Sequence, residues 1–118
     1  MTDREWIFQV VNSFYGLAKN DILIGYHFRI IKDFDEHIPR IAAFWELQLL
    51  HSTQRKFGAP FDVIRIHELM NIKRGELGRW LVLFKKVLNE TEDFPELKAE
   101  WFKKLDSFED KFLRFFAF

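Results

Sequence analysis

The 118-residue sequence contains no cysteine, which excludes disulfide bonds, iron–sulfur clusters and thiolate metal sites. Any bound metal must therefore take nitrogen or oxygen ligands. Basic and acidic residues number 18 each, so the formal net charge is zero. No basic stripe marks a nucleic-acid partner. No apolar run approaches the roughly 20 residues that span a bilayer, so no membrane partner is expected.

Common catalytic motifs are also missing. The sequence has no glycine-rich phosphate loop, no Gly-x-Ser-x-Gly and no His-Glu-x-x-His, because His67-Glu68 has no second histidine four residues on. The charged start, Thr2 to Glu5, shows no signal peptide. We therefore expect a cytoplasmic protein with a single domain spanning residues 1–118.

Aromatic residues are abundant, with 15 phenylalanines and 4 tryptophans. These rings bury large flat surfaces in a core, and the same surfaces would suit a flat planar ligand. Core filling alone is the simpler explanation. Composition therefore permits a planar cofactor without requiring one.

Apolar residues recur at helical spacing, and no segment alternates as a strand does, so the fold class is all-α with five or six helices. Asp3 is expected to cap a first helix, and a short helical segment over 22–31 should leave His27 on the surface. Pro95 is placed as the first residue of the last helix. The expected helix faces comprise Trp6, Ile7, Val10, Val11, Phe14, Tyr15 and Ala18, then Leu77, Trp80, Leu81, Phe84, Val87 and Leu88, then Leu97, Trp101, Leu105, Phe108, Phe112, Phe115 and Phe116.

The helix expected over 36–50 carries its candidate ligand-facing residues on one side. His37, Ile41 and Phe44 share that side, so all three can face one ligand. Arg40 lies at its edge, where its charge can remain at a pocket rim. Tyr15 faces inward from the first helix. His67 lies in a short apolar run before Trp80, and a lone histidine in such a run is usually a core or boundary residue.

In order, these features resemble the truncated haemoglobins, group III in particular. The resemblance rests on Phe14-Tyr15, Asp21, Phe28, the string His37-Ile38-Pro39-Arg40-Ile41-Ala42-Ala43-Phe44-Trp45, Gly58-x-Pro60, His67, and Trp80-Leu81-x-Leu83-Phe84. It covers roughly residues 10–84. The resemblance implies a truncated globin-like two-over-two helical sandwich around a haem, protohaem IX with its iron.

The resemblance also implies residue roles. His67 would be the metal ligand on the proximal side of the iron. Arg40 would reach a propionate, and the ring of Phe28 would pack on the haem. The residues matching the distal pocket are Tyr15, His37 and Trp80, and those counted as haem contacts are His67, Phe28, Arg40, Ile41, Phe44 and Trp80.

We therefore expect a haem protein that binds dioxygen or another diatomic gas ligand at a histidine-ligated iron. Oxygen transport, nitric oxide chemistry and peroxide turnover would all use this pocket, and the sequence does not choose among them or decide whether the protein is an enzyme. A reductase is a candidate partner, and the expected state is a monomer or weak dimer. The alternative is a haem-less globin-fold interaction or sensor module.

Overall fold

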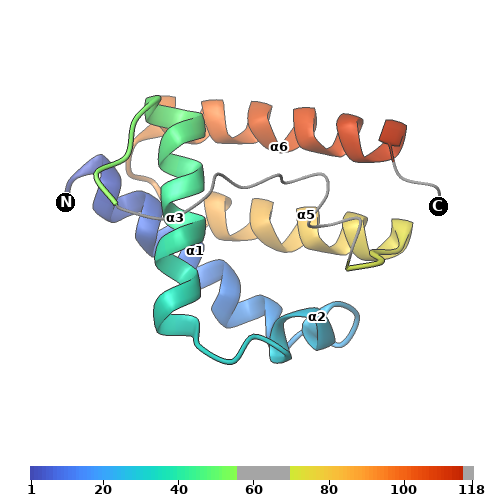
Figure 1. The fold of residues 1–118 in the computed structure, drawn as a ribbon. Coiled ribbons are helices and arrows are strands. Elements are labelled where there is room, and N and C mark those ends of the chain that lie inside the picture. The colour runs from blue at the N-terminus through green and yellow to red at the C-terminus, as the bar shows by residue number, and fades with distance from the viewer. Residues whose placement is uncertain (56–69, 116–118) are drawn as a thin grey trace.

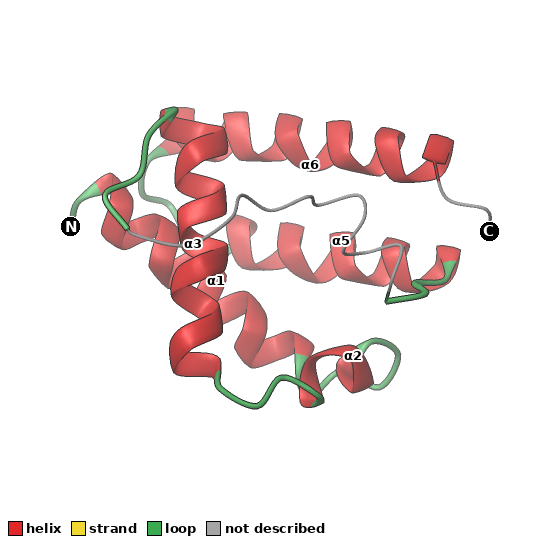
Figure 2. Cartoon of the chain, viewed as in Figure 1, coloured by secondary structure: helices red, strands yellow, loops and turns green. Residues whose placement is uncertain are grey.

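The computed structural model describes residues 1–55 and 70–115, and every regular element within them is a helix (Figures 1 and 2). The expected all-α class is confirmed, whereas the two-over-two arrangement stays a prediction. His67, the expected iron ligand, lies outside the described residues, as does the side chain of Phe115. The helices are α1 (Asp3–Ala18), α2 (Gly25–Arg29), α3 (Phe34–Leu50), α5 (Arg74–Asn89) and α6 (Pro95–Phe115).

The core lies where four helices meet. Helices α5 and α6 run side by side in opposite directions, and α3 crosses them (Figure 1). Helix α1 packs against α3 and α5, while α6 packs against α5 and α3. The ring of Trp101 lies at this junction, with centroids 5.2–5.6 Å from those of Trp6, Trp45 and Phe84. Each helix thus gives one ring to a shared cluster, which accounts for part of the aromatic richness without any ligand.

The predicted apolar faces of α1 and α5 are buried. All seven residues expected on the inner face of α1 are in the core, and so are those of α5 apart from the partly buried Trp80. Pro95 begins α6 as expected. The predicted cap of α1, Asp3, was wrong by one residue. Thr2 is the cap, because its hydroxyl accepts the Glu5 N–H at 3.1 Å and Asp3 is already helical. Threonine meets the same need for an acceptor at the helix start.

Helix α3 begins at Phe34, two residues before the expected start, because Asp33 accepts the Glu36 N–H at 3.2 Å. Its buried face includes Ile38, Ala42 and Trp45. The helix ends where His51 adopts a left-handed φ of 64°. The helix packs against α1, and its His37 lies beside Tyr15 of that helix.

The segment before α2 is fixed by one carboxylate. Asp21 accepts the N–H groups of Leu23 and Ile24 at 3.0 and 3.2 Å, and it also accepts Arg79 of α5 at 2.8 and 2.9 Å. The short helix α2 is thereby held against α5. As a result His27 is buried, and the expectation of a surface histidine was wrong.

Candidate functional site

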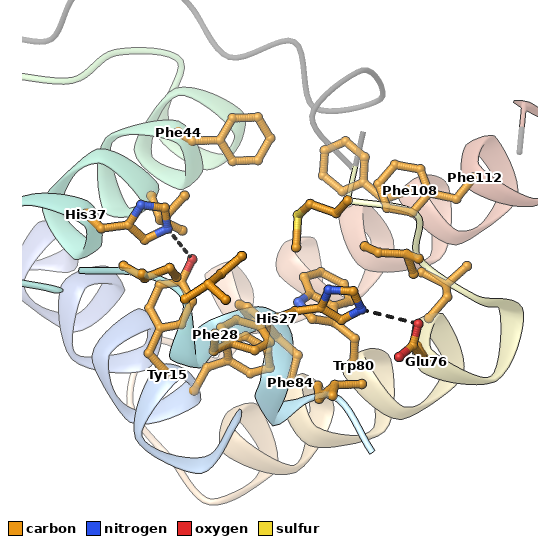
Figure 3. A pocket seen from close by; sticks show the side chains of 18 of the residues that line it. Tyr15, His27, Phe28, His37, Phe44, Glu76, Trp80, Phe84, Phe108 and Phe112 are labelled. Atoms are coloured by element: carbon orange, nitrogen blue, oxygen red, sulfur yellow. Dashed lines mark hydrogen bonds and ion pairs between the residues drawn. The ribbon is translucent and has the colours of Figure 1, made fainter. Parts of the chain in front are cut away.

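A cavity of about 230 Å³ lies among α1, α2, α3, α5 and α6 and is lined mostly by apolar side chains. It brings together most of the residues chosen from the sequence, although they come from four helices (Figure 3). Those that line it are Tyr15, Phe28, His37, Ile41, Phe44 and Trp80. These six residues thus border one cavity, while their role as haem or ligand contacts stays a prediction.

The aromatic wall is built around Phe14. Its ring centroid lies 4.7 Å from that of Phe84 and 5.7 Å from those of Phe28 and Trp80, with the last two in edge-to-face geometry. Tyr15 is the next residue on α1, and its ring lies 5.3 Å from Phe28. Because each ring is held by neighbours on other helices, this wall is rigid and preformed.

Tyr15 and His37 form the polar pair at one end of the cavity. The Tyr15 hydroxyl lies 3.1 Å from Nε2 of His37 (Figure 3). Burial raises the pKa of Tyr15, so the phenol stays protonated at neutral pH. Burial, with help from the charge of Arg40, lowers the pKa of His37, and Glu36 opposes this only in part. The pair is therefore a neutral phenol beside a neutral imidazole.

Arg40 does not line the cavity. Its side chain is 37% exposed, and its guanidinium lies 3.8 Å from Glu36, one turn earlier on α3. The sequence analysis placed this cation at a rim but overlooked Glu36 as its neighbour. An exposed pair of this kind contributes little to stability.

A second polar pair was missed by the sequence analysis. His27 of α2 and Glu76 of α5 both line the cavity, with Nε2 of His27 3.2 Å from Oε1 of Glu76. The Tyr26 hydroxyl donates to the other oxygen of Glu76. Glu76 also accepts the Lys73 N–H at 2.8 Å, which makes it a capping residue of α5. The one feature of the sequence that could have indicated this capping role is the position of Glu76, which is the third residue of its helix.

Away from the cavity, Glu46 is 1% exposed and anchors the chain after α3. It accepts from Arg55 at 3.0 Å, from Arg4 of α1 at 3.4 Å and from the Thr53 hydroxyl. Arg55, in the segment after α3, forms an ion pair with Glu46. The cluster fixes the direction in which the chain leaves α3.

The described ranges, 1–55 and 70–115, contain no group of three histidine, aspartate or glutamate side chains placed to hold a metal ion. Within the same ranges, no helix has the length and apolar character needed to cross a membrane. A haem iron can be held by a single histidine and needs no such group.

Comparison with protein-family models, curated proteins and solved structures gives no match to this chain. Across residues 1–55 and 70–115, fold and site define an all-helical protein with an aromatic cavity that carries a polar pair at each end.

Proposed function

We propose that this protein is a haem protein of the group III truncated haemoglobin type, which binds dioxygen or another diatomic gas at a histidine-ligated iron. The observation that carries the proposal is the convergence of Tyr15, His37 and Trp80 on one aromatic cavity. These residues were chosen from sequence strings far apart in the chain. Their meeting in one cavity, with Phe28 and Ile41, is what a ligand pocket requires.

The side chains that line the cavity are chemically suited to bind a haem. Rings and branched aliphatic side chains from α1, α2, α3 and α5 offer flat apolar contact, and the polar groups gather at the two ends. His67 is the residue that would hold the iron, and it lies outside the described residues. Arg40, whose side chain is 37% exposed, would hold a propionate by a charge-assisted hydrogen bond.

Bound there, a haem supplies an iron that takes diatomic gases, and the residues around it decide which gas is retained. In this chain the hydrogen bond between Tyr15 and His37 sets that choice. If Nε2 of His37 carries a proton, it donates to Tyr15 and leaves the phenol proton free for a ligand. If Nε2 is bare, the phenol donates to it and offers the ligand no proton. The His37 tautomer therefore controls whether Tyr15 acts as a donor.

One observation favours the second candidate, a haem-less globin-fold interaction or sensor module. The cavity volume of about 230 Å³ is below the roughly 300–1,000 Å³ usual for ligand pockets. The packed rings around Phe14 and Trp101 also account for many of the aromatic residues without a cofactor.

Haem titration separates the two candidates. The purified protein is mixed with haem, and the absorption spectrum is followed through stoichiometry, then after dithionite and after carbon monoxide. The haem proposal expects a Soret band that saturates at one haem per chain and shifts with each addition. A spectrum that stays that of free haem at every ratio rejects it in favour of the haem-less module.

A further inference from the structure

The His27–Glu76 pair lies at the opposite end of the cavity from Tyr15 and His37, with Phe28 between the two pairs (Figure 3). Both members are buried, His27 at 8% exposed and Glu76 at 9%. The proposed function gives them no role. A buried histidine with a carboxylate partner on a cavity wall is an arrangement that proteins use to bind ligands and move protons.

The protonation of this pair follows from its hydrogen bonds. Burial by itself would raise the pKa of Glu76, but hydrogen bonds from Tyr26, the Lys73 N–H and His27 outweigh it and lower that pKa. Glu76 is therefore an ionised carboxylate and can only accept hydrogen bonds. Nε2 of His27 must then carry a proton, which it donates to Glu76 at 3.2 Å. In neutral His27 this leaves a lone pair on Nδ1.

No residue within 1–55 or 70–115 bonds to that Nδ1 atom. In the same ranges, Trp101 Nε1 is the one side-chain nitrogen or oxygen that is both fully buried and without a partner. Nδ1 of His27 therefore keeps accessible surface. His27 lines the cavity, so its Nδ1 can offer an acceptor to a guest at this end of a mostly apolar wall.

The size of the cavity selects the class of guest. An apolar cavity of about 150 Å³ is enough to hold one benzene ring. The 230 Å³ available here therefore takes a single ring with a small substituent. Phe14, Phe28 and Phe84 provide ring contacts for such a guest, and the polar groups stand at the ends.

We propose that this cavity binds a small phenol, with its ring among the phenylalanines and its hydroxyl donating to Nδ1 of His27. The carboxylate of Glu76 holds the imidazole in the required tautomer and strengthens Nδ1 as an acceptor. The phenol keeps its proton, so the guest binds without a chemical step. Phenol binding at this site needs no haem. The phenol proposal can therefore be rejected or supported independently of the haem proposal.

The test compares phenol with toluene by calorimetry on the haem-free full chain. Toluene has nearly the same size and lacks the hydroxyl, so the ratio of the two affinities isolates the hydrogen bond. His27→Phe keeps a ring and removes the acceptor, and it is expected to lower the phenol-to-toluene affinity ratio about tenfold. The same ratio in both proteins, or no binding of phenol to the parent, overturns the proposal.

Two further measurements cover misfolding and misassignment. In the ¹⁵N spectrum of the parent, the Nδ1 resonance of His27 should move with phenol and stay fixed with toluene, which requires no variant. If Nδ1 does not respond to bound phenol, the proposal is wrong. His37→Phe tests the other end of the cavity. Loss of the phenol preference in this variant but not in His27→Phe would place the hydroxyl at the pair of Tyr15 and His37 and overturn the assignment.

Discussion

At the scale of single residues, the haem proposal makes ligand choice depend on the Tyr15 hydroxyl. It is buried, it faces an apolar cavity, and its one hydrogen-bond partner in the described chain is Nε2 of His37. A hydroxyl in such a site has few competing partners, so any hydrogen bond it gives a ligand is strong. A ligand that carries negative charge gains most, and a ligand such as carbon monoxide gains little.

Tyr15→Phe is therefore expected to speed oxygen release from the haem-loaded protein and to change carbon monoxide release little. A hydrogen bond of about 1–3 kcal/mol corresponds to one to two powers of ten in affinity. Most of this change should appear in the dissociation rate, because the bond forms after ligand entry. Stopped-flow replacement of oxygen by carbon monoxide measures it. Equal oxygen release rates in parent and variant would leave Tyr15 with a structural role.

His67 is the residue that the haem proposal needs most. His67→Ala should abolish stoichiometric haem binding or leave a haem without its axial histidine. The measurement is the deoxy absorption spectrum at one haem per chain. His51→Asn is the matched control, because His51 is exposed and asparagine tolerates its left-handed φ of 64°. A parent-like deoxy spectrum in His67→Ala would show that another residue ligates the iron.

At the scale of elements, Glu46 joins α1, α3 and the segment after α3 through Arg4, Arg55 and Thr53. Glu46→Gln keeps the shape and removes the charge that two arginines share. The free energy of unfolding should fall by about 1.5–3 kcal/mol, the usual value of hydrogen bonds to a charged group. Urea denaturation measures it.

The control is Glu100→Gln, the same change at an exposed position whose ion pair with Lys103 spans 3.4 Å. It should change stability by less than about 0.5 kcal/mol. Equal losses in the two variants would mean that the Glu46 cluster contributes nothing beyond a surface pair.

Asp21 links α2 to α5, and its pKa gives that link a pH dependence. The hydrogen bond from Arg79 lowers the pKa of Asp21, burial opposes this, and the N–H groups of Ile24 and Leu23 lower it further. Because the folded pKa lies below the unfolded one, the link contributes stability above about pH 4 and loses it as pH falls through the folded pKa.

Asp21→Asn should therefore be less stable than the parent at pH 7 and should lose less stability between about pH 5 and pH 2. Urea midpoints across that range measure the difference. Asp35→Asn, at an exposed position in the first turn of α3, is the control and should follow the parent curve. Parallel curves for Asp21→Asn and the parent would contradict the link.

The helices themselves could be predicted, because their apolar periodicity is local. The face of α1 from Trp6 to Ala18 and the start of α6 at Pro95 follow from spacing and capping within a few residues. His27 could not be placed in this way. Its burial depends on Glu76, which lies 49 residues further along the chain, and on the tie between Asp21 and Arg79.

In the candidate site too, some residues could be predicted from the sequence and others depend on partners far along the chain. Tyr15, His37 and Trp80 were found because the resemblance carries their spacing, and each lines the cavity. Glu46 and Glu76 are missing from that prediction because an acidic residue in a helix is usually exposed. Their burial rests on partners from other elements, and no local pattern announces such partners.

At the scale of the whole molecule, occupation of the cavity should govern stability. The cavity lies among all five described helices, so a ligand that fills it joins them in one packed unit. A ligand that binds the folded chain alone adds about 2.7 kcal/mol to the free energy of unfolding at 100 times its dissociation constant. For a chain of 118 residues this raises the melting temperature by roughly 10 °C.

Haem at about 100 times its dissociation constant is therefore expected to raise the melting temperature of the parent. Circular dichroism at the helical band measures this temperature. His67→Ala should gain much less, because the iron loses its bond to the chain while the ring contacts remain. A parent that melts at the same temperature with and without haem would favour the haem-less module. An equal gain in melting temperature in both proteins would mean that haem binds through its apolar faces alone. The cavity would then still bind haem, but His67 would not be its iron ligand.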